Sequence, residues 1–117
     1  MATPDLAEYR QALVRDRDTT AAQLDRLRRD LDEIFRAAAD VAVDDEHDPE
    51  GATIAYERSR TGALIAQAEA HLDEIALALR RVDAGTYGVC LECGSPIGSA
   101  RLLARPAART CVACSSR

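Results

Sequence analysis

The stretch Cys90-Leu91-Glu92-Cys93, with Cys111-Val112-Ala113-Cys114 further along, decides how the C-terminal part of this chain folds. Two CxxC pairs separated by 17 residues have the spacing of a four-cysteine zinc site. A tetrahedral Zn²⁺ takes four thiolates at about 2.3 Å. Because Cys90, Cys93, Cys111 and Cys114 would fill every coordination position, the sequence predicts one structural zinc ion without a metal-activated water.

Paired cysteines also form disulfide bonds or redox-active dithiols. Disulfides suit an oxidising compartment, yet the chain opens with the polar stretch Met1-Ala2-Thr3-Pro4-Asp5 rather than with an apolar signal segment. A thioredoxin-like CxxC requires a βαβ context, and no such pattern is visible. We therefore expect a zinc-binding, cytoplasmic protein.

Apolar residues before the cysteines recur every seven positions, which is typical of a coiled-coil seam. The first row is Leu6, Leu13, Thr20, Leu27, Ile34 and Val41, and the row after the loop is Ile54, Thr61, Ala68, Ile75 and Val82. Thr3-Pro4-Asp5 predicts the start of the first helix, because it offers an N-cap, a proline at the first helical position and an acid. Gly85 predicts the end of the second helix through a left-handed backbone conformation.

The two helices should fold back on each other at an acidic turn. Pro49 disfavours helical geometry at Asp48, so the first helix should end before it. Two heptad helices joined by a short loop form an antiparallel hairpin, in which facing residue numbers would sum to about 95. A dimeric coiled coil is the alternative, but Pro49 and the loop favour a hairpin and a monomer.

The predicted fold class is therefore mainly α: a long antiparallel coiled-coil hairpin followed by a small four-cysteine zinc finger. We expect the hairpin to occupy residues 1–84, with its acidic tip at 44–52, and the zinc finger to occupy residues 85–117. A helical turn is expected from Ser99 to Ala104 because Arg105-Pro106 would end it.

The distribution of charged and apolar residues argues against two classes of function, non-specific duplex binding and membrane spanning. Residues 1–84 hold 11 Arg and 19 Asp or Glu, whereas residues 85–117 hold four Arg and one Glu. The acidic body disfavours non-specific duplex binding, since phosphates would be repelled. No run of 18 apolar residues exists, so we expect no membrane span.

The cysteine segment resembles a known family. Tyr87-Gly88-Val89-Cys90-Leu91-Glu92-Cys93-Gly94, Pro96-Ile97, Arg101-Leu102, Ala104-Arg105-Pro106 and Cys111-Val112-Ala113-Cys114 are similar to the DksA/TraR zinc-finger family. The chain ends three residues after Cys114, so the resemblance implies a short form without the C-terminal helix of longer members.

The resemblance implies a transcription regulator that binds bacterial RNA polymerase. Such proteins insert a coiled-coil tip into the secondary channel and modulate initiation without sequence-specific DNA binding. The tip pattern Asp-x-x-Asp-x-Ala of well-studied members is similar to Asp48-Pro49-Glu50-Gly51-Ala52-Thr53, which is one residue shorter. The implied tip residues are Asp44, Asp45, Glu46, Asp48, Glu50 and Ala52.

The resemblance also implies a second contact. Members that respond to ppGpp use basic residues near the zinc module, and Arg101 and Arg105 are the candidates for a partner or nucleotide contact. Whether ppGpp is needed stays open.

Two other functions compete with a non-enzymatic regulator. Gre-type factors also insert an acidic coiled-coil tip and hold a second Mg²⁺ for transcript cleavage, but they resemble this chain in the hairpin alone. A nucleic-acid-binding zinc ribbon is the other alternative, although four arginines with few aromatic residues make a poor groove or stacking surface. His47 and His71 lack partners at ligand spacing and are expected to be surface residues.

Overall fold

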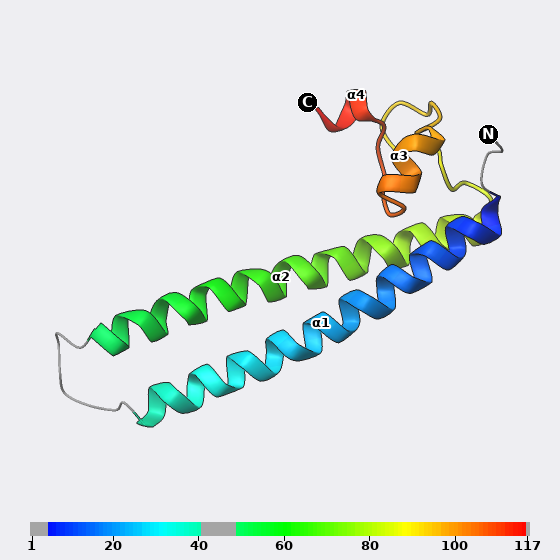
Figure 1. Ribbon diagram of the computed structural model, residues 1–117. Coiled ribbons are helices and arrows are strands. Elements are labelled where there is room, and N and C mark those ends of the chain that lie inside the picture. Colours follow the sequence, from blue (N-terminus) through cyan, green and yellow to red (C-terminus); the bar gives the residue numbers. More distant parts are fainter. Residues whose placement is uncertain (1–4, 41–48, 117) are drawn as a thin grey trace. The chain divides into compact units, whose positions relative to one another are not determined.

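The computed structural model describes residues 5–40 and 49–116, and these residues form four helices (Figure 1). The two long helices are α1, Leu6–Asp40, and α2, Pro49–Ala84. They run antiparallel as a hairpin, which confirms the expected fold class. The short helices α3, Ser99–Ala104, and α4, Val112–Ser115, lie in the cysteine segment.

The helix boundaries follow local chemistry. The Asp5 carboxylate caps α1 by accepting the Glu8 backbone N–H at 2.9 Å, while the expected cap at Thr3 lies outside the described residues. Pro49 is the first residue of α2, a position that suits proline because the N–H it lacks would have no partner inside the helix. Gly85 stops α2 with a φ of 78°, and the Thr86 N–H donates to the Arg81 carbonyl at 2.9 Å.

The described residues divide into two compact units. One unit combines α1 up to Thr19 with the chain from His71 onward, so it holds the cysteine segment and the adjoining ends of both long helices. The other unit runs from Thr20 to Ala70.

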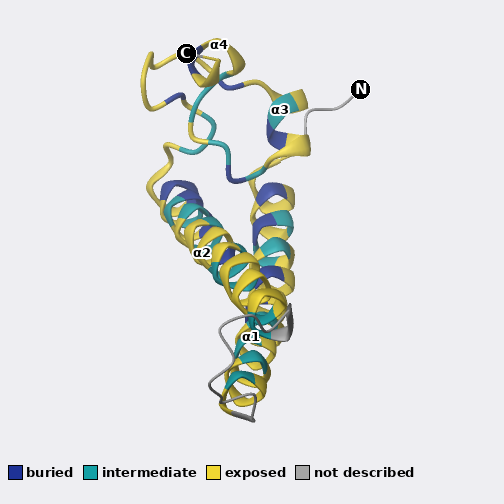
Figure 2. Cartoon of the chain, turned by 90° about the vertical axis from the view of Figure 1, so that its left-hand side faces the viewer, coloured by how far each residue is buried: buried dark blue, intermediate teal, exposed yellow. Residues whose placement is uncertain are grey.

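Figure 2 colours the buried residues dark blue, and in the unit that holds the cysteines they form two clusters. The first cluster is made by Tyr9, Cys90, Ile97, Leu102 and Cys114. The second joins Leu13 of α1, Ala107 of the cysteine segment and a row on α2, which is Ile75, Ala78 and Val82. Leu13 and Val82 are thus in one cluster, in agreement with the predicted hairpin register.

The unit from Thr20 to Ala70 is thinly packed. Leu24 and Ala68 are buried, but the seam residues Leu27 and Ile34 are only half-buried. Phe35 is 48% exposed, and the Arg58 guanidinium lies 5.9 Å from its ring centroid. Arg28 and Glu69 form an exposed ion pair at 3.3 Å across the hairpin, a contact that contributes little in water. None of the described helices is long and apolar enough to cross a bilayer.

Candidate metal centre

The connection after α2 is fixed before it reaches the first cysteine. The backbone carbonyl of Arg81 accepts the N–H groups of Thr86 and Tyr87 at 2.9 and 3.1 Å. Arg81 is 8% exposed, and its guanidinium donates to the carbonyls of Thr86 and Val89. One arginine therefore holds both ends of the segment that leads into Cys90.

The first CxxC pair lies in a tight turn. The Cys90 N–H donates to the Ser95 carbonyl at 2.8 Å, and the Gly94 N–H donates to the Cys90 carbonyl at 3.0 Å. Gly94 has a φ of 76°, which favours glycine at this position. An antiparallel bridge between Val89 and Pro96 closes the turn, so both sulfurs are carried by one rigid loop.

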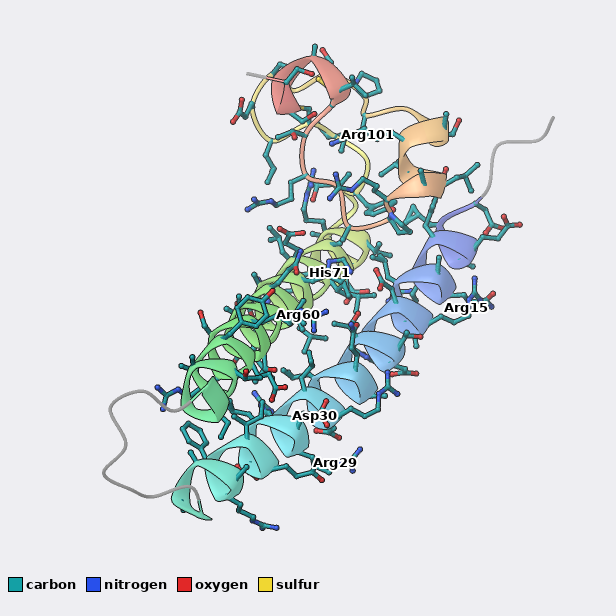
Figure 3. The ribbon with its side chains drawn as sticks, turned by 60° about the vertical axis from the view of Figure 1, so that its left-hand side comes forward. Arg15, Arg29, Asp30, Arg60, His71 and Arg101 are labelled. Carbon is teal, nitrogen blue, oxygen red and sulfur yellow. The ribbon has the colours of Figure 1, made fainter. Side chains whose placement is uncertain are left out.

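The second CxxC pair is attached to this loop and to α3. The Leu91 N–H donates to the Arg109 carbonyl at 2.9 Å, which ties the two cysteine-bearing loops together. Arg101 of α3 donates from Nε to the Thr110 carbonyl at 2.8 Å, directly before Cys111 (Figure 3). Cys111 then precedes the single turn of α4, whose last half carries the buried Cys114.

These loops bring the four predicted ligands together. The sulfur atoms of Cys90, Cys93, Cys111 and Cys114 all lie within 4.8 Å of one another, the one such metal-capable group in residues 5–40 and 49–116. The Cys93 and Cys111 sulfurs are 3.8 Å apart, far beyond a disulfide length of about 2.05 Å. A tetrahedron with metal–sulfur bonds of about 2.3 Å has edges of about 3.8 Å. The observed spacing fits that geometry.

The thiol chemistry also fits a divalent cation. Hydrogen bonds from the backbone N–H groups of Cys111 and then Cys93 lower the pKa of Cys90 to about 6. The N–H of Ser95 lowers the pKa of Cys93. In contrast, a hydrogen bond with the Cys111 side chain, followed by burial, raises the pKa of Cys114 to about 12, because both favour the neutral thiol. A cation among them would favour the thiolate form of all four.

Beside the metal centre lies a cavity of about 380 Å³ with mixed charge. The two predicted contact residues, Arg101 and Arg105, line it together with Arg109. The opposite charges come from the long helices, where Asp16 of α1 and Glu74 of α2 also line the cavity. Arg101 is half-buried, and its Nε donates a hydrogen bond to the Thr110 carbonyl, whereas Arg105 is exposed.

Sequence reasoning missed His71 as part of this cavity. His71 is half-buried, and its Nε2 lies 2.8 Å from Asp16 Oδ2, while its Nδ1 lies 3.8 Å from Glu74 Oε2 (Figure 3). The spacing of His71 and Glu74 on one helix was visible in the sequence. The closer partner, Asp16, is 55 residues away and becomes a neighbour only through the hairpin.

The tip residues are mostly beyond what the structure describes. Asp44, Asp45, Glu46 and Asp48 lie outside the described residues, as does His47. Glu50 lies in the first turn of α2, and Ala52 is exposed in the same helix. The role of this acidic segment stays a prediction.

Comparison with known proteins adds independent information. Residues 85–117 match the model of the prokaryotic dksA/traR C4-type zinc finger. A Caulobacter vibrioides protein named RNA polymerase-binding transcription factor DksA is 52% identical over 46 residues, which is 39% of this chain and 32% of that protein. The uncharacterized protein YteA of Bacillus subtilis is 38% identical over 73 residues, 62% of this chain and 30% of YteA. The matches thus span about a third of the length of these curated relatives.

The similarity to a solved structure extends over nearly the whole chain. Transcription factor DksA2 from Pseudomonas aeruginosa superposes with a TM-score of 0.78 at 30% identity, covering 96% of this chain and 81% of DksA2. The zinc-finger match and the four clustered sulfurs together support one structural Zn²⁺. Because four thiolates complete a tetrahedral shell, the ion's contribution at this centre is to hold the two CxxC loops together.

Proposed function

Because the chain belongs to the DksA/TraR family of four-cysteine zinc-finger proteins, we propose that it is a transcription regulator that binds bacterial RNA polymerase. The observation that carries this proposal is the likeness to DksA2, since it includes the helical hairpin as well as the zinc finger. Binding, rather than catalysis, is the activity we assign. The zinc centre has no free coordination position at which a water or substrate would be activated.

We place the acidic tip of the hairpin in the polymerase secondary channel. The segment 44–50 carries five acids, Asp44, Asp45, Glu46, Asp48 and Glu50. Carboxylates brought near the catalytic Mg²⁺ ions or basic active-site residues would change the local potential and shift the populations of mobile catalytic elements. Initiation at sensitive promoters would change as a result, without any contact that reads DNA sequence.

The cavity beside the zinc centre is our proposed second contact. Arg105 is the better contact residue, because it is exposed, whereas Arg101 already donates to the Thr110 carbonyl. A phosphorylated nucleotide such as ppGpp or an acidic polymerase surface would meet Arg105 and Arg109 on one wall. Asp16 and Glu74 on the opposite wall repel an anion, so we expect any nucleotide bound here to contact the arginine wall alone.

A paired-variant experiment tests the role of the tip. Asp48→Asn with Glu50→Gln removes two tip charges, and Asp25→Asn with Asp32→Asn removes two charges from exposed positions on α1. Both variants should bind core RNA polymerase within about twofold of the parent protein, since single exposed charges contribute little to affinity. In promoter-specific transcription, the tip variant should lose the regulatory effect and the α1 variant should keep it.

The same assay separates the competing functions. Equal regulation by the parent protein and the tip variant would rule out a functional tip. Release of short RNA from stalled elongation complexes, dependent on Asp48 and Glu50, would instead assign a Gre-like cleavage role. Salt-sensitive binding of the chain alone to duplex or single-stranded DNA would assign a zinc-ribbon role.

A further inference from the structure

The cavity beside the metal centre is lined by arginines that do not pair with the acids facing them. Arg101, Arg105 and Arg109 line it from the cysteine segment, and Asp16 and Glu74 line it from the long helices. None of these arginines forms an ion pair with a carboxylate in residues 5–40 and 49–116. The arginine charges are therefore available to a ligand.

The fold holds the arginine side of the cavity in place. The Tyr87 hydroxyl donates to the Pro106 carbonyl at 2.8 Å, and Ala107 packs in one buried cluster with Leu13 of α1. Pro106 and Ala107 both line the cavity, so the loop that begins at Arg105 is attached at two adjacent residues. The cavity is thus formed before a ligand binds, which lowers the cost of binding.

The two acids differ in the contacts that they already make. Asp16 is held by His71, whose Nε2 lies 2.8 Å from Asp16 Oδ2. Glu74 Oε2 lies 3.8 Å from His71 Nδ1, which is beyond hydrogen-bond distance, and the Glu74 side chain is 39% exposed. Glu74 is therefore the carboxylate better placed to receive a cation from solvent. Arg105 and Arg109, which are both exposed, are the groups placed to receive an anion.

Electrostatics limits the kind of ligand that suits this cavity. A simple anion is attracted by Arg105 and Arg109 but repelled by Glu74, and a simple cation meets the reverse. A molecule that carries both charges is attracted by both sides. The cavity volume of about 380 Å³ equals that of roughly a dozen water molecules at about 30 Å³ each, so the ligand is small.

We propose that this cavity binds a small zwitterion, whose ammonium group pairs with Glu74 and whose carboxylate pairs with Arg105 and Arg109. A carboxylate matches the guanidinium fork, because its two oxygens accept two parallel N–H bonds. The proposal goes beyond polymerase binding, since it assigns a small ligand to the chain itself. It also gives the arginine contact proposed above a ligand that satisfies the acidic side.

Three probes of one carbon-chain length test this proposal on the zinc-loaded full chain. 6-Aminohexanoate carries both charges, hexanoate carries only the anion, and hexylamine carries only the cation. Titrations at low ionic strength, followed by amide chemical shifts, should show 6-aminohexanoate binding with changes around Glu74 and residues 105–109. Each of the other two probes should bind about fivefold more weakly, the effect of losing one partly exposed ion pair.

Two charge-removing variants separate the ends of the ligand. Glu74→Gln should weaken 6-aminohexanoate about fivefold and strengthen hexanoate, because the repulsion of the anion is removed. Arg105→Gln should also weaken 6-aminohexanoate, but it should strengthen hexylamine. The control is Asp73→Asn, an exposed neighbour of Glu74 outside the cavity lining, which should change each affinity by less than about twofold. A distorted cavity would weaken all three probes and would not produce these opposite signs.

Two results would overturn the proposal. One is equal affinity of the parent protein for the three probes, or no shift change at the cavity with 6-aminohexanoate, and this result requires no variant to fold. The other is a Glu74→Gln variant whose affinities for 6-aminohexanoate and hexanoate both match those of the parent. These titrations contain no polymerase, so their failure is separate from a failure of polymerase binding.

Discussion

Arg81 shows how strongly the cysteine segment depends on one side chain. It is buried, has no carboxylate partner among residues 5–40 and 49–116, and donates hydrogen bonds to the carbonyls of Thr86 and Val89. A sequence pattern does not predict this role, because two adjacent arginines, Arg80 and Arg81, lie near the end of α2 and look alike in the sequence. Gly85 has a φ of 78° and ends α2, and the chain that follows it supplies the two carbonyls to which Arg81 donates.

Substitution of Arg81 should therefore destabilise the cysteine segment. Arg81→Ala would leave two carbonyls without donors, and we expect the free energy of unfolding of the zinc-loaded chain to fall by about 2–3 kcal/mol. Arg80→Ala, at the exposed neighbouring position, should change it by less than about 0.5 kcal/mol. Denaturant unfolding in excess zinc measures both, and equal losses would show that Arg81 has no special role.

Tyr87 makes stability depend on alkaline pH. Burial, with a smaller contribution from nearby Tyr9, raises the pKa of Tyr87 to about 12, against an ordinary value near 10. Since the folded-state pKa is the higher one, this contribution is complete below about pH 10 and is lost as the pH rises toward 12.

Comparison of the parent protein with Tyr87→Phe isolates that effect. The stability advantage of the parent over the variant should be constant up to about pH 9 and should shrink between about pH 10 and 12. The chain has no lysine, and titrations that the parent and Tyr87→Phe share cancel in the comparison. An advantage that stays constant throughout would mean that the Tyr87 phenol titrates normally when folded.

At the scale of elements, the sequence predicted the helices well. The starts and stops at Pro49, Gly85 and Ser99–Ala104 follow from proline and glycine chemistry that acts within a few residues. The hairpin register also agrees with expectation, since Arg10 pairs with Asp83 at 2.7 Å and Arg28 with Glu69 at 3.3 Å. What heptad spacing alone could not predict is how deeply each seam position is buried. Leu6 is 45% exposed although it occupies the same row as the fully buried Leu13.

Two glycines of the second helical segment should respond oppositely to alanine. Gly62 lies inside α2, and a Cβ built there meets no atom within 4 Å, so Gly62→Ala should stabilise the chain by about 0.5–1 kcal/mol. Gly85 has a φ of 78°, so Gly85→Ala should destabilise it by about 1–2 kcal/mol. Thermal unfolding of both variants in excess zinc measures the difference, and a shift of the same sign in both would contradict this account.

At the scale of the whole molecule, we expect zinc binding to stabilise the adjoining ends of α1 and α2 as well as the cysteine segment. Ala107 of that segment packs in one cluster with Leu13 of α1 and Ile75 of α2, so ordering of the module and of the adjoining helix ends is linked. The four-cysteine spacing made the metal centre predictable from sequence. The cavity beside it was not predictable, because its walls come from residues on three separate segments, such as Asp16, His71 and Arg105.

Metal removal should make this linkage visible. After chelation, we expect amide hydrogen exchange to accelerate throughout residues 86–116 and also in α1 around Tyr9 and Leu13. Exchange in the segment Thr20–Ala70 should change little, because the four cysteines all belong to the other compact unit. Unchanged protection around Tyr9 and Leu13 would show that the helix ends hold together without zinc.

The central claim is that this chain binds RNA polymerase through the secondary channel, and crosslinking tests it most directly. A photo-reactive amino acid would replace Glu46 in the zinc-loaded full chain, with a second protein carrying it at the exposed position of Asp25 as the control. The account predicts crosslinks from position 46 to active-site elements of core RNA polymerase and none to those elements from position 25. Failure of the zinc-loaded, folded chain to bind or crosslink to the polymerase would contradict the proposed function and leave the family relationship as one of fold.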